Sequence, residues 1–317
     1  MATSDSVNYI VTRDDIISEA LQLVGALEEG GTPTATQLSD CSRTLNMLVK
    51  YWAADGLKVW VNEELVVFPV KNQRQYTFGA SGDRMCRESE LVTTKLNGGL
   101  AASATSITVD STTGMTASDV IGIATTAADI HWDVISSVDD STTLTLTTGV
   151  DAVCADNSRV YTYTTVFAQR ILKINNAWLR DTNDIDIPIG VISREEYSTL
   201  SNKYESGRVN QVYFDPKVST TKMNVWPVPN DSNTDERLYL YATRLYEDFD
   251  AASDNPDFPQ EWYMPLAWNL GVSIAPKYGV SGTRLAELAQ LAIGMKNNAD
   301  TWSVEQTSVF IKPAKHH

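Results

Sequence analysis

The residues of this sequence most suited to acid–base chemistry are three adjacent pairs of glutamates: Glu28/Glu29, Glu63/Glu64 and Glu195/Glu196. A glycosidase places two carboxylates on either side of a cleft and holds their pKa values apart. Neighbouring side chains on a helix or a strand point in different directions, so adjacent glutamates do not meet that requirement. We interpret the pairs as solvated faces or ends of elements, and we expect no catalytic residue and no enzyme.

The histidines and cysteines are too few to build a metal centre or a catalytic triad. Of the three histidines, His316 and His317 are terminal, and His131 alone supplies neither a histidine metal site nor a triad. The cysteines are too scattered for a disulfide framework or a zinc cluster: Cys41, Cys86 and Cys154. Phosphate-binding and dinucleotide-binding glycine motifs are absent as well. We therefore expect free thiols, synthesis inside a cell, no metal and no cofactor.

Two short motifs leave weaker alternatives open. Asp139-Asp140 could offer oxygen ligands to calcium, but the regular Asp/Asn-Gly spacing of a calcium loop is missing, which favours a solvated acidic loop. His131-Trp132 could stack on a sugar, but in an alternating strand such a pair more often has the Trp in the core and the His at its edge. Trp and Tyr residues between positions 226 and 278 lack interleaved basic clusters, so they indicate core and interface aromatics rather than base stacking.

The charge of the chain excludes a general DNA-coating role. Forty acidic residues stand against 25 basic ones, which gives a net charge of −15 and a pI near 4.6. A phosphate backbone needs a basic face, so only a local basic patch could bind nucleic acid. The first ten residues lack the pattern of a signal peptide, and the longest apolar stretch, 262–275, is too short to span a bilayer. We expect a soluble, non-secreted protein that does not contact membranes.

The elements that must position any site begin with a helical hairpin. Thr12 is a suitable N-cap for a first helix, and Gly30-Gly31 and Pro33 end it. Thr34 with Gln37 forms a capping-box pattern that starts a second helix, which closes at Gly56. Each helix has one apolar stripe, so the two should pack antiparallel.

Residues 96–165 form a separate segment by composition. They contain no proline, 23 of the 70 are Ser or Thr, and their net charge is −7. Their alternation of apolar and polar residues predicts five short strands: 106–110, 120–123, 131–138, 143–147 and 159–163. Such strands describe a small all-β module, a barrel or sandwich; low-complexity disorder is the rival interpretation.

The remaining patterns predict strands, a short helix and two final helices. Strands are expected at 57–61, 65–70, 75–78, 167–179, 185–192, 209–214, 223–226 and 238–243. Ser193 and Glu196 form a capping box for a helix that ends near Tyr204. Helices follow at 264–274 and from Leu285 to Trp302. We predict an α+β fold: a discontinuous helical-hairpin and mixed β core (1–95 and 166–302), an inserted β module (96–165) and an extended arm (303–317).

Two groups of segments resemble a known family. The first is "DDIISEALQLVGAL…TPTATQLSDCSRTLNMLVKYWAADGLKVW"; the second is "VYFDP…MNVWPVPND" with "YEDFDAASDNPDFPQEWYMPLAWNLGVSIAPKYGV". Over roughly residues 10–95 and 166–300, the chain resembles the tail accessory, or head-to-tail adaptor, proteins of short-tailed bacteriophages, also called packaged-DNA stabilisation proteins. The segments "GMTASDVIGI" and "HWDVISSV" resemble insertions common in phage structural proteins.

The resemblance implies a structural virion protein at the head–tail junction, made and assembled in the host cytoplasm. Its implied partners are a portal ring, a downstream tail hub or nozzle protein, and other copies of itself in a ring of twelve-fold symmetry. Genome DNA would pass through the lumen without specific binding, which an acidic protein favours because it repels phosphate. Two alternatives stay open: a tail-associated peptidoglycan hydrolase, since some members are reported to degrade cell walls, and a receptor- or sugar-binding tail protein acting through the β module.

The C-terminal arm supplies the candidate contact residues. Val309-Phe310-Ile311 is an apolar run followed by Lys312 and Pro313, and it begins a few residues after Trp302. Because proline removes a backbone donor, about five residues remain able to pair with a sheet edge or fill a neighbour's groove. We expect contacts to the portal or a neighbouring subunit through Trp302, Val309, Phe310, Ile311 and Lys312; a frayed tail is the alternative.

Overall fold

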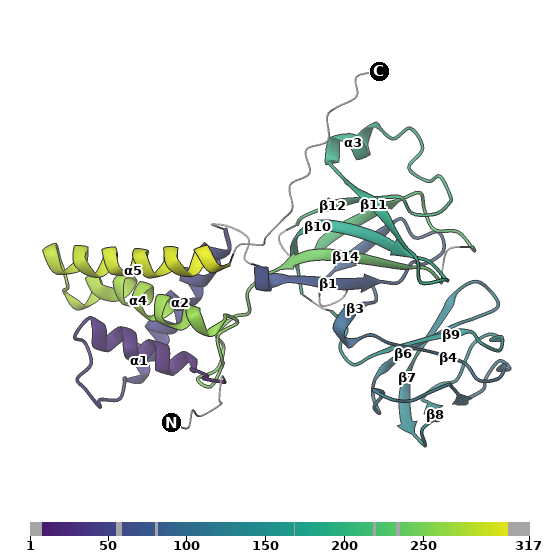
Figure 1. The fold of residues 1–317 in the computed structure, drawn as a ribbon, viewed down its shortest axis with the longest axis horizontal. Helices are drawn as coiled ribbons and strands as arrows, with labels where there is room; N and C mark the ends of the chain where they lie inside the picture. Colours follow the sequence, from purple (N-terminus) through teal and green to yellow (C-terminus); the bar gives the residue numbers. More distant parts are fainter. Residues whose placement is uncertain are drawn as a thin grey trace, which may run out of the picture. The chain divides into compact units, whose positions relative to one another are not determined.

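The chain folds as two compact units (Figure 1). The computed structural model describes residues 8–54, 59–79, 82–167, 169–217, 220–232 and 235–303. The helical unit comprises both ends of the chain, up to Val61 and from Tyr246 onwards, and the β unit is the continuous stretch Asn62–Leu245. The expected α+β composition is confirmed. However, the helices and mixed strands that the sequence analysis placed in one core belong to different units, because the apolar faces of the terminal helices pack on one another.

In the helical unit, α4 (Tyr263–Ile274) is the central helix. It contacts α1 (Arg13–Leu23), α2 (Ala35–Ala54) and α5 (Gly282–Trp302). Three short 3-10 helices complete the unit: η1 (Val59–Val61), η3 (Gln260–Trp262) and η4 (Ala275–Tyr278). The expected pair α1–α2 exists, but both helices pack mainly on α4, which comes from the other end of the chain.

Local capping signals place the helix starts correctly. The Thr12 hydroxyl accepts the backbone N–H of Asp15, whose carboxylate accepts the backbone N–H of Thr12. Thr34 and Gln37 make the same reciprocal pair before α2. These bonds satisfy amide groups that have no partner within the helix, as the sequence analysis predicted.

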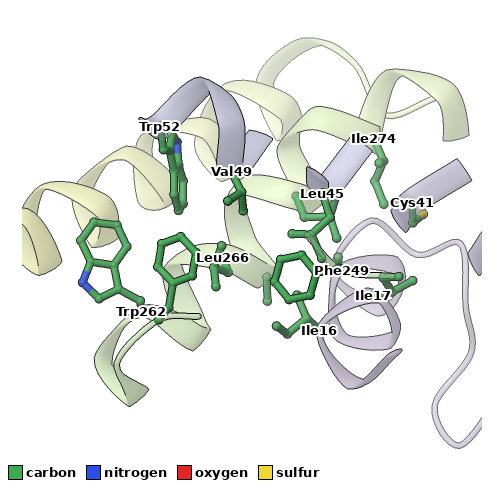
Figure 2. Close-up of a cluster of buried hydrophobic side chains, with 14 of the residues drawn as sticks. Ile16, Ile17, Cys41, Leu45, Val49, Trp52, Phe249, Trp262, Leu266 and Ile274 are labelled. Carbon is green, nitrogen blue, oxygen red and sulfur yellow. The ribbon is translucent and has the colours of Figure 1, made fainter. Parts of the chain in front are cut away.

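The core of the helical unit joins residues from both ends of the chain (Figure 2). Side chains of α1 and α2 meet those of α4 and the segments before it: Ile16, Ile17, Cys41, Leu45, Val49, Trp52, Phe249, Trp262, Leu266 and Ile274. Burying each of the larger side chains contributes about 1.5–3 kcal/mol. The N-terminal hairpin therefore depends on the C-terminal helices for its stability.

The β unit contains an eight-stranded sheet in the order β2-β13-β12-β11-β10-β14-β1-β3. Its strands are β1 (Asn62–Val67), β2 (Gln75–Phe78), β3 (Met85–Arg87), β10 (Ile171–Arg180), β11 (Asp186–Ile192), β12 (Gln211–Asp215), β13 (Thr221–Trp226) and β14 (Arg237–Arg244). Neighbours are antiparallel except β11 and β12, which are parallel and linked through α3 (Arg194–Thr199). The Ser193–Glu196 capping box starts α3 as predicted.

The second sheet of the β unit has six antiparallel strands in the order β4-β9-β6-β7-β8-β5. They are β4 (Val92–Lys95), β5 (Ser106–Thr108), β6 (Val120–Ala124), β7 (Ile130–Val138), β8 (Thr143–Leu146) and β9 (Arg159–Tyr163). A single bridge between Leu96 and Val109 links the two edge strands, so the sheet curls toward a barrel. All five strands expected in 96–165 are present. The sheet nevertheless begins before the expected boundary, because β4 pairs with β9.

Two expected element boundaries are wrong for reasons of packing. Of the strand expected at 57–61, residues Val59–Val61 form a 3-10 helix, and 57 and 58 lie outside the described residues. The Trp60 ring packs against Trp262 and Phe258 there, so tertiary contacts override the β propensity. Helix α3 ends at Thr199 rather than near Tyr204. In the described part of the chain, no helix is long and apolar enough to cross a bilayer.

The two sheets of the β unit meet in a cluster of aromatic side chains. The ring of Phe68, which follows β1, lies 4.8 Å from that of Trp132, 5.3 Å from Tyr161 and 6.1 Å from Tyr163, measured between centroids. Trp132 lies across from Gly122 in the β6–β7 pair, where a Cβ on the glycine would come within 2.6 Å of the indole. The missing side chain of Gly122 therefore makes room for the indole.

Candidate functional site

The three glutamate pairs have structural surroundings rather than catalytic ones. Glu63 accepts from the Arg87 guanidinium at 2.9 Å and the Arg244 guanidinium at 2.7 Å, so it is an ion-pair centre and not the solvated residue expected. Glu196 caps α3. Among the described residues, no group of three or more His, Cys, Asp or Glu side chains could hold a metal ion.

The β module's polar candidates are likewise engaged within the fold. His131 Nδ1 lies 2.9 Å from the Asp151 carboxylate, and the imidazole is largely buried rather than exposed at an edge. Trp132 packs between the two sheets, as expected for a core residue. The Asp140 carboxylate accepts the backbone N–H groups of Thr142 and Thr143, which makes it the centre of a turn.

The three cysteines are buried free thiols. Burial raises the pKa of the Cys41 and Cys154 thiols above the ordinary value, and of Cys86 further still. Only the thiolate is a good nucleophile, so these groups are unreactive at neutral pH.

The most exposed apolar surface of the helical unit lies along α5. The 3-4 spacing from Leu285 to Trp302 would place one stripe of α5 against the core, but the residues of that stripe that are buried are Ala292 and Ala299. The indole of Trp302 is 87% exposed, and Leu291 and Met264 are each more than half exposed. Large apolar side chains facing solvent at one end of a helix pair are typical of a contact surface.

Two hollows flank the exposed indole of Trp302. The first, with a volume of about 480 Å³, is lined by Met264, Pro265, Met295, Asn298 and Trp302, with Glu261 at its edge. The second, about 400 Å³, lies between Trp302 and the aromatic residues Trp60 and Trp262. We name this region, with its two hollows, the Trp302 groove. Its polar groups are a carboxylate and amides, which suits an apolar side chain or a peptide better than a reaction.

The structure places one of the five predicted contact residues in this groove. Trp302 lines both hollows, whereas Val309, Phe310, Ile311 and Lys312 lie outside the described residues. Sequence reasoning missed Met264, Leu291 and Met295. A signal was available, because α5 carries more large apolar residues than one stripe can bury.

Comparison with known proteins adds no relative to this description. No protein-family model and no curated protein matches the chain. The function must therefore be argued from the surface itself and from the charge of the chain.

Proposed function

We propose that the protein is a structural, non-catalytic component of a phage virion, an adaptor ring that joins the portal to the tail and retains packaged DNA. In this proposal each subunit contacts the portal ring, a downstream tail protein and other copies of itself. The observation that carries it is the Trp302 groove, because a fully exposed indole between two apolar hollows is a typical anchor for a protein partner. The resemblance of the terminal segments supplies the identity of the partners.

The distribution of charge supports passage of DNA without binding. The helical unit carries a net charge of −8 and the segment 96–165 carries −7, whereas residues 62–95 and 166–245 together are neutral. The whole excess of negative charge thus lies in two parts of the chain. Surfaces of this sign repel a phosphate backbone, so a DNA chain sliding past them would not be held.

The test is assembly of the purified protein on a portal ring, followed by negative-stain imaging. Trp302→Ala should leave folding unchanged, because the indole makes little contact within the subunit, but it should weaken ring assembly at least as much as a typical interface anchor, about 2 kcal/mol. Tyr204→Ala removes another exposed aromatic side chain, from the β unit, and serves as the control. Equal assembly by wild type and W302A would remove the groove from the proposal.

The C-terminal arm is tested by truncation after Trp302. We propose that Val309, Phe310, Ile311 and Lys312 add contacts to the portal or a neighbouring subunit. The truncated protein should melt at the same temperature as the full chain and fail to assemble on the portal. If it assembles and retains DNA as well as the full chain does, the arm has no part in the adaptor.

A further inference from the structure

The helical unit has two outer faces on opposite sides of its central helix. Helix α5 packs on α4, and α1 and α2 also pack on α4, while α5 makes no comparable contact with α1 or α2 (Figure 1). The outer side of α5 and the outer side of α2 are therefore separate surfaces of one compact body. Both carry apolar side chains that the subunit itself leaves uncovered.

The α5 face is a groove along the helix with a glycine at its centre. Glu287, Gln290, Leu291, Gly294, Met295 and Asn298 line a hollow of about 630 Å³. A glycine inside a helix costs about 1 kcal/mol relative to alanine. A Cβ built on Gly294 has no atom of the subunit within 4 Å, so no packing inside the chain requires its absence. The open backbone at Gly294 instead permits close approach of a second helix.

The α2 face is also apolar but carries the opposite charge. Met47 is 59% exposed and Tyr51, one turn later, is 68% exposed. Beside Met47, a hollow of about 660 Å³ is lined by Leu38, Ser42 and Met47 together with Arg13 and Arg43. The α5 groove has Glu287 among its lining residues and no lysine or arginine. The two faces are thus unlike in shape and complementary in charge.

We propose that the α5 face of one subunit packs against the α2 face of the next, which makes a head-to-tail contact between copies of this chain. A heterologous contact needs two different patches on each subunit, and it generates a ring when the rotation closes. Packing α5 on α2 places Gly294 where helix axes approach to about 8–10 Å and covers Met47 and Leu291. This inference rests on the proposed ring, for which it names the contact between neighbouring subunits.

Cross-linking of single-cysteine variants tests the pairing, because the native cysteines are buried. Gly294→Cys and Met47→Cys proteins are treated with a short bismaleimide, separately and mixed. The mixture should give a cross-linked dimer in roughly tenfold excess over either variant alone, a preference of about 1.4 kcal/mol. Ile293→Cys replaces Gly294→Cys as the control, since Ile293 is exposed on α5 but lines neither hollow.

Each outcome separates this contact from the alternatives. Cross-linking of Gly294→Cys with itself shows a two-fold contact, and equal yields with Ile293→Cys show random collision; both overturn the inference. If rings form on a portal but their subunits do not cross-link between positions 294 and 47, the adaptor function stands and this contact is wrong. If the mixture cross-links but no ring forms on a portal, the contact stands and the adaptor function is wrong.

Discussion

Two glycines with opposite surroundings give a test at the scale of single residues. In Gly122→Ala the new methyl group meets the Trp132 indole and Ile130, and overpacking of this kind costs about 1–3 kcal/mol. In Gly294→Ala the methyl group enters open space in the free subunit, and the gain in helix propensity should stabilise it by about 0.5–1 kcal/mol. Urea unfolding of the two variants should therefore shift in opposite directions. A loss of stability in G294A would mean that α5 packs more tightly than the structure shows.

Asp184 links the two sheets of the β unit through charge. Its carboxylate accepts from Arg159 of β9 and from Arg237 of β14, and the hydrogen bond from Arg159 lowers the pKa of Asp184 below the ordinary 3.8. A carboxylate whose pKa is lowered by folding adds stability above the unfolded value, and that stability is lost as the pH falls through the folded value.

Asp184→Asn should remove this pH-dependent part of the free energy of unfolding. Because the carboxylate is more than half exposed, the loss at neutral pH should not exceed about 1 kcal/mol. Unfolding of the two proteins between pH 7 and acid should converge as the pH falls below about 4. Asp110→Asn, at an exposed aspartate with no ion pair among the described residues, controls for net charge. Parallel curves for D184N and wild type would show that the link contributes nothing.

At the scale of elements, Phe68 holds the six-stranded sheet against the eight-stranded one. It is 2% exposed and touches Trp132, Tyr161 and Tyr163. Phe68→Ala should cost about 3–5 kcal/mol and increase amide exchange at the edge of the module that faces it. Phe214→Ala, at a half-buried ring in the other core cluster, should cost less and leave exchange in the module unchanged. Unchanged exchange in F68A would mean that the module is held by other contacts.

How well the elements could be predicted depends on how local their causes are. Thr12, Thr34 and Ser193 start helices through bonds to residues three positions away, so the sequence alone locates them. The alternating strands of 96–165 were equally legible. The strands β3 and β4 are only three or four residues long and exist because distant partners, β1 and β9, pair with them. A stripe on a helix shows that one face is apolar but not which helix covers it, and so α4 could not be identified as the partner of α1.

At the scale of the whole molecule, the β unit is continuous and the helical unit is not. A fragment comprising residues 62–245 should fold alone, since both of its sheets and their shared aromatic cluster lie within it. Circular dichroism and a dispersed amide spectrum would verify this. The matched fragment 8–61, without its C-terminal partners, should be unfolded or aggregated because α4 supplies the centre of its core. A folded 8–61 fragment would contradict the arrangement of Figure 2.

The interruption of the helical unit by the β unit sets a timetable for synthesis. Helices α1 and α2 leave the ribosome first, but Leu266 and Ile274 of α4 follow only after residues 62–245 have been made. At about 5–20 residues per second, that wait is on the order of 10–40 s. During it, the apolar stripe of α2 is exposed to chaperones and to other nascent chains on the same message. Any lengthening of the six-stranded sheet prolongs the wait, so the size of that module bears on the yield of assembled subunits as well as on their shape.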